Sequence, residues 1–175
     1  HEFIIRLKEH PDTHDKIRIL IPDLKISKRI LICDIDNTII KSSNWIFFLT
    51  NNLKEMKHSK ETLKFLSEKF YIVYLTHREE RFTCVTRKWL DDHQFPVGPI
   101  FFWNKKEDPF SNFKFKTGAM NIIRDKSAIP LEVGIGDRES DIKAYQKMGI
   151  IHHFLLKQES DWIKIREVFE DGIDL

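Results

Sequence analysis

Cysteine and long hydrophobic runs are scarce in this sequence of 175 residues. Its two cysteines, Cys33 and Cys84, stand far apart and have no cysteine or histidine partners at the spacing of metal ligands. This argues against a disulfide framework and a zinc site, and it favours a reducing compartment, the cytoplasm. The apolar stretches are far shorter than the roughly 20 residues of a membrane-spanning helix, and no signal peptide is recognisable. We therefore expect no transmembrane segment.

An excess of charge of one sign is also missing. Lysine and arginine total 29 and aspartate and glutamate total 27, so the net charge is +2. The broad basic field of many nucleic-acid-binding proteins is therefore absent, and a polyanion would have to bind a local patch. Hydrophobic residues make up 41% and charged residues 32% of the chain, which excludes general disorder. The sequence predicts one compact domain and leaves its oligomeric state open.

The chain alternates between predicted strands and predicted helices. Five short runs rich in β-branched or aromatic residues predict buried strands: 29–34, 70–75, 99–103, 132–135 and 151–156. The segments between them have helical spacing, and a last helix is expected from Ser160 onwards. This βαβα order predicts an α/β fold with a Rossmann-like, doubly wound parallel sheet over residues 29–175.

The first 28 residues differ in pattern from the rest of the chain. Residues 3–7 and 17–21 resemble strands, and the turn-prone Pro11-Asp12-Thr13 lies between them. We expect residues 1–28 either to extend the sheet or to be the tail of an upstream domain.

The first chemical motif is the segment Asp34-Ile35-Asp36-Asn37-Thr38, directly after the predicted strand 29–34. Ligands of open α/β sheets bind at the carboxyl ends of the strands, where these two carboxylates would lie. One of the two, Asp34 or Asp36, would then attack a substrate while the other handles a proton. The alternative is a turn rich in Asp and Asn that merely ends the strand.

The second motif is Gly136-Asp137 with Asp141 four residues later, at the end of another predicted strand. One helical turn separates the two carboxylates, so both face the same edge of the sheet. Acidic residues are common in the first turn of a helix, but this explains one aspartate better than the pair. Four carboxylates in one crevice would repel one another, so a shared Mg²⁺ is predicted, with a metal-free acid pair as the alternative.

Two further residues complete the set of candidate site residues. Thr76 follows the predicted strand 70–75, and Lys116 is predicted to precede a helix. A hydroxyl, backbone N–H groups and a lysine are suited to hold phosphoryl oxygens. Lys114 is an alternative to Lys116 in this role. Alone, a threonine at a strand end is usually structural and a lysine is usually a surface charge.

These four motifs, in this order, resemble those of the haloacid dehalogenase (HAD) superfamily, and the match runs from about residue 29 to 154. The resemblance implies a Mg²⁺-dependent phosphomonoesterase with an aspartyl-phosphate intermediate on Asp34. Asp36 would be the proton donor and later the base. Thr76 and Lys116 would stabilise charge on the transferred oxygens.

The resemblance also implies the metal ligands. They are Asp34, the Asp36 carbonyl and Asp137, with Asp141 in support.

Three segments, residues 95–100, 113–116 and 136–150, resemble the lipin-type and actin-patch-type phosphatidate phosphatases. Residues 86–90 are similar to the phosphatase half of polynucleotide kinase-phosphatases. Some residues depart from these families: Asn37 replaces the more common Gly or Asp, and Asp137 stands where lipin-type proteins commonly have Asn. The bulky His77 and Arg78 follow Thr76, and we expect them to alter the phosphate pocket.

No insertion is long enough for a large lid, so the resemblance implies a minimal cap. An open crevice favours a phosphate on a large or surface-bound molecule, with a phosphatidate-like lipid at a membrane surface as the first candidate. Alternatives are a polynucleotide 3′-phosphatase, a silent module that binds phosphate or a partner, and phosphoryl transfer to a sugar. Two aromatic segments are expected to form either a substrate rim or part of the core. Their members are Trp45, Phe47 and Phe48 in the first and Phe101, Trp103 and Phe110 in the second. His152 and His153 are expected to be packing or surface residues.

Overall fold

The computed structural model describes residues 2–6, 14–18, 28–41, 53–104 and 111–171. A five-stranded sheet forms the centre of the molecule, with the strand order β7-β6-β3-β8-β9. Every neighbouring pair in this sheet is parallel. The strands are β3 (Arg29–Cys33), β6 (Phe70–Glu79), β7 (Ile100–Trp103), β8 (Leu131–Gly136) and β9 (His152–Leu155). All five strands predicted in this region are confirmed.

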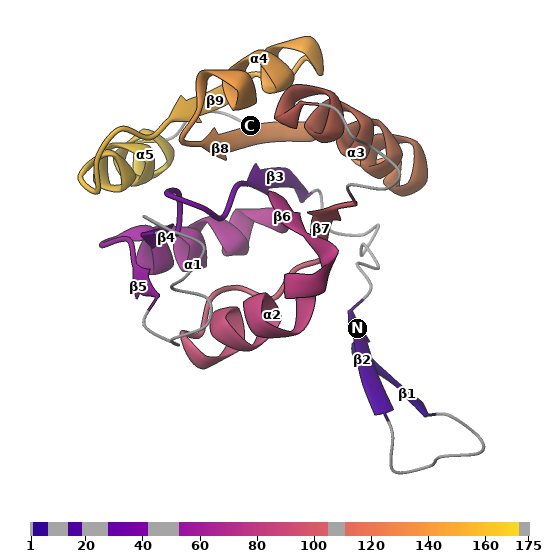
Figure 1. Cartoon of the computed structure of the whole chain (residues 1–175). Coiled ribbons are helices and arrows are strands. Elements are labelled where there is room, and N and C mark those ends of the chain that lie inside the picture. Colours follow the sequence, from indigo (N-terminus) through magenta and orange to yellow (C-terminus); the bar gives the residue numbers. More distant parts are fainter. Residues whose placement is uncertain (1, 7–13, 19–27, 42–52, 105–110, 172–175) are drawn as a thin grey trace.

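Helices cover both faces of the sheet, as Figure 1 shows. One face packs against α1 (Ser59–Lys69), α2 (Thr83–Asp92) and α5 (Asp161–Glu170), and the other against α3 (Asn112–Ser127) and α4 (Glu139–Lys147). Side chains of a strand alternate between the faces, so Leu31 and Cys33 of β3 join one core cluster while Ile30 and Ile32 join the other. The predicted doubly wound α/β fold is confirmed.

The order of the strands reverses at β3. From β3 the chain goes to β6 on one side and, after β7, returns to β8 on the other side. In open α/β sheets the crevice at such a reversal, beyond the carboxyl ends of the strands, is the usual place of a ligand. Asp34 directly follows β3, and Asp137 directly follows β8. The topology therefore brings the two predicted motifs to the same edge of the sheet.

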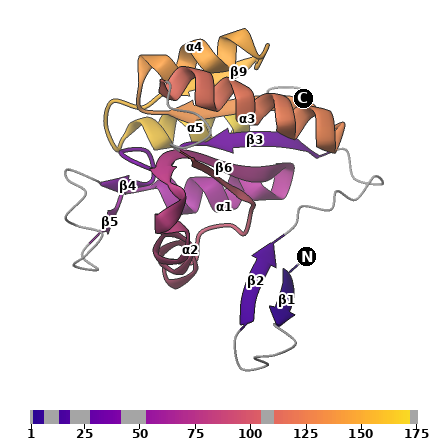
Figure 2. The same cartoon turned by 45° about the vertical axis from the view of Figure 1, so that its right-hand side comes forward.

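The N-terminal strands pair with each other. Strands β1 (Glu2–Arg6) and β2 (His14–Arg18) form an antiparallel two-stranded sheet of their own, visible at the lower right in Figure 2. Among the described residues, neither of these strands joins the five-stranded central sheet. Whether residues 1–28 belong to an upstream domain stays a prediction.

A second small hairpin follows the first motif. It consists of β4 (Ile40–Lys41) and β5 (Lys54–Glu55), which pair in antiparallel fashion. A short 3₁₀ helix, η2 (Glu80–Phe82), connects β6 to α2. Trp45, Phe47, Phe48 and Phe110, predicted for the rim or the core, lie outside the described residues. Within the described part of the chain, none of the helices has the length and apolarity required to cross a bilayer.

Candidate active site

The first motif forms a tight loop at the end of β3. The backbone N–H groups of Ile39 and Ile40 both donate to the Ile35 carbonyl, which folds the loop back on itself. Asn37 has φ of 53°, a left-handed conformation that glycine and asparagine adopt more readily than most other residues. Asparagine at position 37 is therefore compatible with the shape of this loop. The loop leaves Asp34 buried, and Thr38 Oγ1 donates a hydrogen bond of 3.3 Å to Asp34 Oδ2.

The second motif lies at the end of β8 and the start of α4. A Cβ atom on Gly136 would lie 2.6 Å from Asp141 Oδ2, so glycine is what lets Asp141 approach the strand so closely. Asp141 is fully buried, and its Oδ2 accepts a hydrogen bond of 3.3 Å from the backbone N–H of Arg138. Burial leaves the pKa of Asp137 in this motif raised, although Asn37 of the first motif lowers it.

The two motifs bring three carboxylates together. Asp34, Asp137 and Asp141 each offer one oxygen, and these three oxygens lie within 4.8 Å of one another. Such a set of hard anionic ligands suits Mg²⁺, which prefers carboxylate oxygens. The residues therefore fit a divalent cation, as the sequence predicts. Asp36, the fourth predicted acid, does not join this cluster through its side chain.

Lys116 reaches the cluster from α3. Its Nζ lies 2.7 Å from Asp34 Oδ1 and 2.8 Å from Asp141 Oδ1. The expectation that Lys116 precedes a helix is wrong: α3 begins at Asn112, because Phe113 and Phe115 pack against the core and start the helix earlier. Lys114, the alternative, is exposed, whereas Lys116 is buried.

Burial and the neighbouring charges shift the pKa values of these groups. Burial raises the pKa of Asp34 to about 7, with Lys116 opposing the rise and Asp141 adding to it. Burial, followed by the charge of Asp141, also raises the pKa of Asp137. Burial alone would lower the pKa of Lys116, but Asp34 and Asp141 outweigh it and leave that pKa raised. One lysine thus compensates the carboxylates only in part, and a bound cation would complete the compensation.

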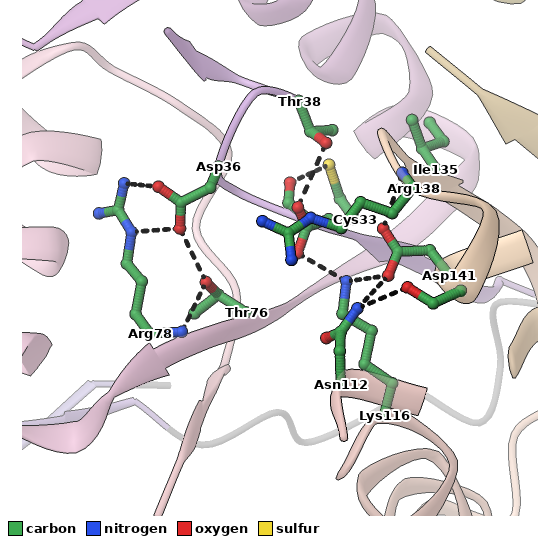
Figure 3. Close-up of polar contacts among 12 residues, drawn as sticks. Cys33, Asp36, Thr38, Thr76, Arg78, Asn112, Lys116, Ile135, Arg138 and Asp141 are labelled. Atoms are coloured by element: carbon green, nitrogen blue, oxygen red, sulfur yellow. Dashed lines mark hydrogen bonds and ion pairs between the residues drawn. The ribbon is translucent and has the colours of Figure 1, made fainter. Parts of the chain in front are cut away.

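Asp36 belongs to a separate group of contacts, seen at the left of Figure 3. Arg78 Nε donates to Asp36 Oδ2 and Arg78 Nη2 donates to Asp36 Oδ1, both over 2.7 Å. Thr76 Oγ1 donates to Asp36 Oδ2 over 3.3 Å and accepts the Arg78 backbone N–H over 3.2 Å. Thr76, predicted to end its strand, lies inside β6, which continues to Glu79 past a register shift. Its hydroxyl is thus turned toward Asp36.

Two residues near the site have contacts that the sequence motifs do not predict. Asn112 Nδ2 donates to Asp141 Oδ1 over 2.8 Å and to Ser140 Oγ over 3.0 Å. Its position four residues before Lys116 is the signal that could have placed both on one face of a helix. Arg78 is expected from the sequence only as a bulky neighbour of Thr76, because its partner Asp36 is 42 residues away.

Aromatic side chains lie beside the site at the end of β7. The rings of His77 and Trp103 stack at a centroid distance of 4.2 Å, and Phe115 approaches His77 edge-on at 6.0 Å. Trp103 is half-buried and Phe101 packs against the core. His152 and His153 are expected from the sequence to pack or lie at the surface. The His152 ring contacts the Phe169 ring, and the His153 ring is hydrogen-bonded to the Ile150 carbonyl.

Comparisons with known proteins agree with this geometry. Residues 31–155 match the family described as PITM 1-3, LNS2 domain. A protein from Mesorhizobium loti, described as a HAD-like phosphatase, is 14% identical with a TM-score of 0.68, covering 97% of this chain and 93% of that one. A HAD-superfamily hydrolase of subfamily IA from Geobacter sulfurreducens is 11% identical with a TM-score of 0.53, covering 80% of this chain and 97% of that one. At these identities the likeness shows the fold.

A third similar structure is a chain of the Pnkp1/Rnl/Hen1 complex. It is 15% identical with a TM-score of 0.62, and the match covers 77% of this chain and 47% of that one. The chain thus spans about half the length of that relative. The curated protein sequences contain no significant match. The predicted HAD-like fold is confirmed by these structures.

Proposed function

The chain belongs to the LNS2 domain family of PITM 1-3, and we propose that it is a Mg²⁺-dependent phosphomonoesterase that acts through an aspartyl-phosphate on Asp34. The observation that carries the proposal is the placement of Asp34. It lies buried at the end of the central strand, 2.7 Å from Lys116 and beside Asp137 and Asp141. A nucleophile, a cation for the phosphoryl oxygens and the ligands of a metal are thus within reach of one phosphate.

In the first half-reaction an Asp34 carboxylate oxygen attacks phosphorus. The bond from phosphorus to the ester oxygen breaks as the bond to Asp34 forms, and Asp36 gives its proton to the leaving oxygen. In the second half-reaction Asp36 takes a proton from water. The water oxygen attacks phosphorus, and the bond to Asp34 breaks, which releases inorganic phosphate and restores the carboxylate.

The remaining residues handle charge. Lys116 would pair with the phosphoryl oxygens, and Thr76 would hold Asp36 and offer backbone N–H groups nearby. Asp34, Asp137 and Asp141, with the Asp36 carbonyl, would hold Mg²⁺. A bound Mg²⁺ reduces the repulsion between the incoming phosphate and the carboxylates.

The proposed substrate is a phosphate on a large or surface-bound molecule, with a phosphatidate-like lipid first. This rests on the small size of the described insertions: within the described residues between β3 and α1 lies the hairpin β4–β5 and no helix. A small cap leaves the crevice open to a bulky substrate.

A polynucleotide 3′-phosphatase is the second candidate. The Pnkp1/Rnl/Hen1 complex, one of whose chains shares this fold, is described as an RNA repair complex. A silent phosphate-binding module is the candidate from another class, since both Asp36 oxygens are engaged by Arg78.

Phosphate release tests these candidates directly. We would assay vesicles of phosphatidate in phosphatidylcholine, a 3′-phosphorylated oligonucleotide and p-nitrophenyl phosphate, each with Mg²⁺ and with EDTA. We expect turnover that EDTA abolishes, fastest on the vesicles, and a loss of at least about 1,000-fold in Asp34→Asn because the nucleophile is gone.

The matched control is Asp125→Asn, which makes the same change at an exposed position of α3 and should keep wild-type rates. Faster turnover of the oligonucleotide would favour the second candidate. Tight binding of phosphatidate without turnover would establish the silent module, and full activity in Asp34→Asn would refute the mechanism.

A further inference from the structure

Arg78 is a buried arginine whose guanidinium is held on two sides. Only 3% of its side chain is exposed, and it makes the bidentate pair with Asp36 described above. On the other side, Arg78 Nη1 donates to Thr86 Oγ1 of α2 over 3.1 Å, and Thr86 is itself buried. A planar guanidinium fixed in this way imposes both the position and the plane of the carboxylate that it contacts.

Arg78 and Lys116 form ion pairs with different acids of the site. Lys116 pairs with Asp34 and Asp141, whereas Arg78 pairs with Asp36. The two groups lie on opposite sides of the view in Figure 3. The carboxylate of Asp36 is therefore held apart from the nucleophile and from the proposed metal ligands, although its charge still acts on Asp34.

This separation matches the geometry of an in-line displacement. The attacking oxygen of Asp34 and the leaving oxygen must lie on opposite sides of phosphorus. A proton donor serves the leaving oxygen only from that opposite side. If Arg78 were absent, Lys116 would be the other buried cation among the described residues able to attract the Asp36 carboxylate, and Lys116 lies on the side of the nucleophile.

We infer that Arg78 is a positioning residue that keeps the Asp36 carboxylate on the leaving-group side of the site, and that Thr86 holds Arg78 in place. The inference rests on the proposed phosphatase function and deepens it. It makes Arg78 a determinant of leaving-group range: the contact matters most for alkyl phosphates, whose leaving oxygens need a proton, and least for aryl phosphates with acidic leaving groups.

The test compares two leaving groups in the same protein. We would measure kcat and KM for an alkyl phosphate and for p-nitrophenyl phosphate in Arg78→Met, Arg78→Lys, Thr86→Val and Asp36→Asn. Arg78→Met is expected to lose about 100-fold in kcat/KM on the alkyl phosphate and less than about 10-fold on the aryl phosphate, because kcat/KM reports the first half-reaction, in which the leaving group departs. The kcat also includes hydrolysis of the shared aspartyl-phosphate with Asp36 as base, so it should fall on both substrates. Arg78→Lys should recover part of the loss, because it restores the charge without the bidentate fork.

A double variant separates positioning from a general structural effect. In the Asp36→Asn background, Arg78→Met should cause no more than about a twofold further loss on the alkyl phosphate, since its action passes through Asp36. Arg81→Met is the matched control, because Arg81 is an exposed arginine three residues later, and it should keep wild-type rates on both substrates.

Some outcomes would overturn the inference alone. With an active wild type, equal losses in kcat/KM on both leaving groups, or losses that multiply in the double variant, would show that Arg78 does not act through Asp36. If Arg78→Met fails to fold, Thr86→Val decides, with an expected loss in kcat/KM of about 3- to 10-fold confined to the alkyl phosphate. A wild type silent on every phosphate ester would overturn the proposed function and this inference together.

Discussion

At the scale of single residues, the site depends on a glycine at a position where no larger residue fits. Gly136 lies at the end of β8, and an added Cβ would meet Asp141 at 2.6 Å from Oδ2 and 2.8 Å from Cβ. Real Cβ atoms do not approach so closely, so either the strand or the first turn of α4 must shift. The close packing of β8 against Asp141 is therefore part of how the carboxylate cluster is built.

This predicts a defect in metal binding for Gly136→Ala. Displacement of Asp141 should weaken the affinity for Mg²⁺ by about 10- to 100-fold, the range seen when the surroundings of a metal ligand are disturbed. A Mg²⁺ titration followed by thermal unfolding measures this. The control is Gly118→Ala in α3, where an added Cβ meets nothing within 4 Å. This substitution should stabilise the helix by about 0.5–1 kcal/mol, because alanine has a higher helix propensity than glycine. Titration curves of Gly136→Ala that superimpose on wild type would contradict this account of the cluster.

Residue contacts also mark the limit of what the sequence reveals. Asp34, Asp137 and Asp141 were predictable because each follows a recognisable strand or lies one turn further on. The pair of Asp36 and Arg78 was not, because it joins positions 42 apart and depends on where the β6 extension places an arginine. The same holds for Asn112, whose partner Asp141 is 29 residues away.

At the scale of elements, the five buried strands were predictable because strands of a parallel sheet form short continuous apolar runs. The limits of α3 were not predicted. Its first turn contains Phe113 and Phe115, which are partly buried and pack against the core. Placing the helix start at Asn112 is what puts Lys116 in the acid cluster.

Helix α5 supports the nucleophile loop from a distance. Trp162 is fully buried, and its Nε1 donates to the Thr38 carbonyl over 3.0 Å, across 124 positions of sequence. We expect Trp162→Phe to lower the free energy of unfolding by about 1–3 kcal/mol, because the buried carbonyl loses its donor. Urea unfolding measures the change. Ile163→Ala, at a more exposed position of the same helix, is the control and should change it by about 0.5 kcal/mol or less. An equal effect of the two substitutions would show that the contact is unimportant.

The start of α5 gives a prediction for pH. Hydrogen bonds from Lys164 and from the backbone N–H of Lys157, with that of Gln158, lower the pKa of Asp161 to about 2. A carboxyl group whose pKa is lower in the folded state contributes stability above its unfolded pKa of about 3.9, and this contribution is lost as pH falls toward 2. Asp161→Asn should therefore lower the free energy of unfolding at pH 7 by about 0.2–1 kcal/mol, the range of a charge interaction screened by solvent.

The difference between wild type and Asp161→Asn should shrink as pH falls below 4. Urea unfolding at pH 7, 4 and 3 follows it. Asp125→Asn is the matched control, since Asp125 is exposed in the last turns of α3 and contacts Arg124 over 3.6 Å. A difference that stays constant across this range would mean that the charge of Asp161 does not stabilise the start of α5.

At the scale of the whole molecule, the reversal of strand order at β3 joins distant segments into one site. The groups of the proposed mechanism come from the carboxyl ends of β3, β6 and β8 and from one face of α3. They are the proposed nucleophile, the proposed proton donor with its arginine, the proposed metal ligands and the lysine. Figure 1 shows the sheet between its two layers of helices, which fix these ends in place. The near balance of positive and negative residues fits a protein whose charges matter locally at this edge.

The central claim is that Asp34 becomes phosphorylated at this edge, and trapping the intermediate tests it most directly. Asp36→Asn should still react with p-nitrophenyl phosphate and Mg²⁺, because this leaving group needs no proton, but should hydrolyse the acyl phosphate slowly. Acid quenching and mass spectrometry should then find one phosphoryl group on the peptide that contains Asp34, and none when Asp34→Asn is added. Phosphate release with no label on that peptide, or with the label on another residue, would contradict the account.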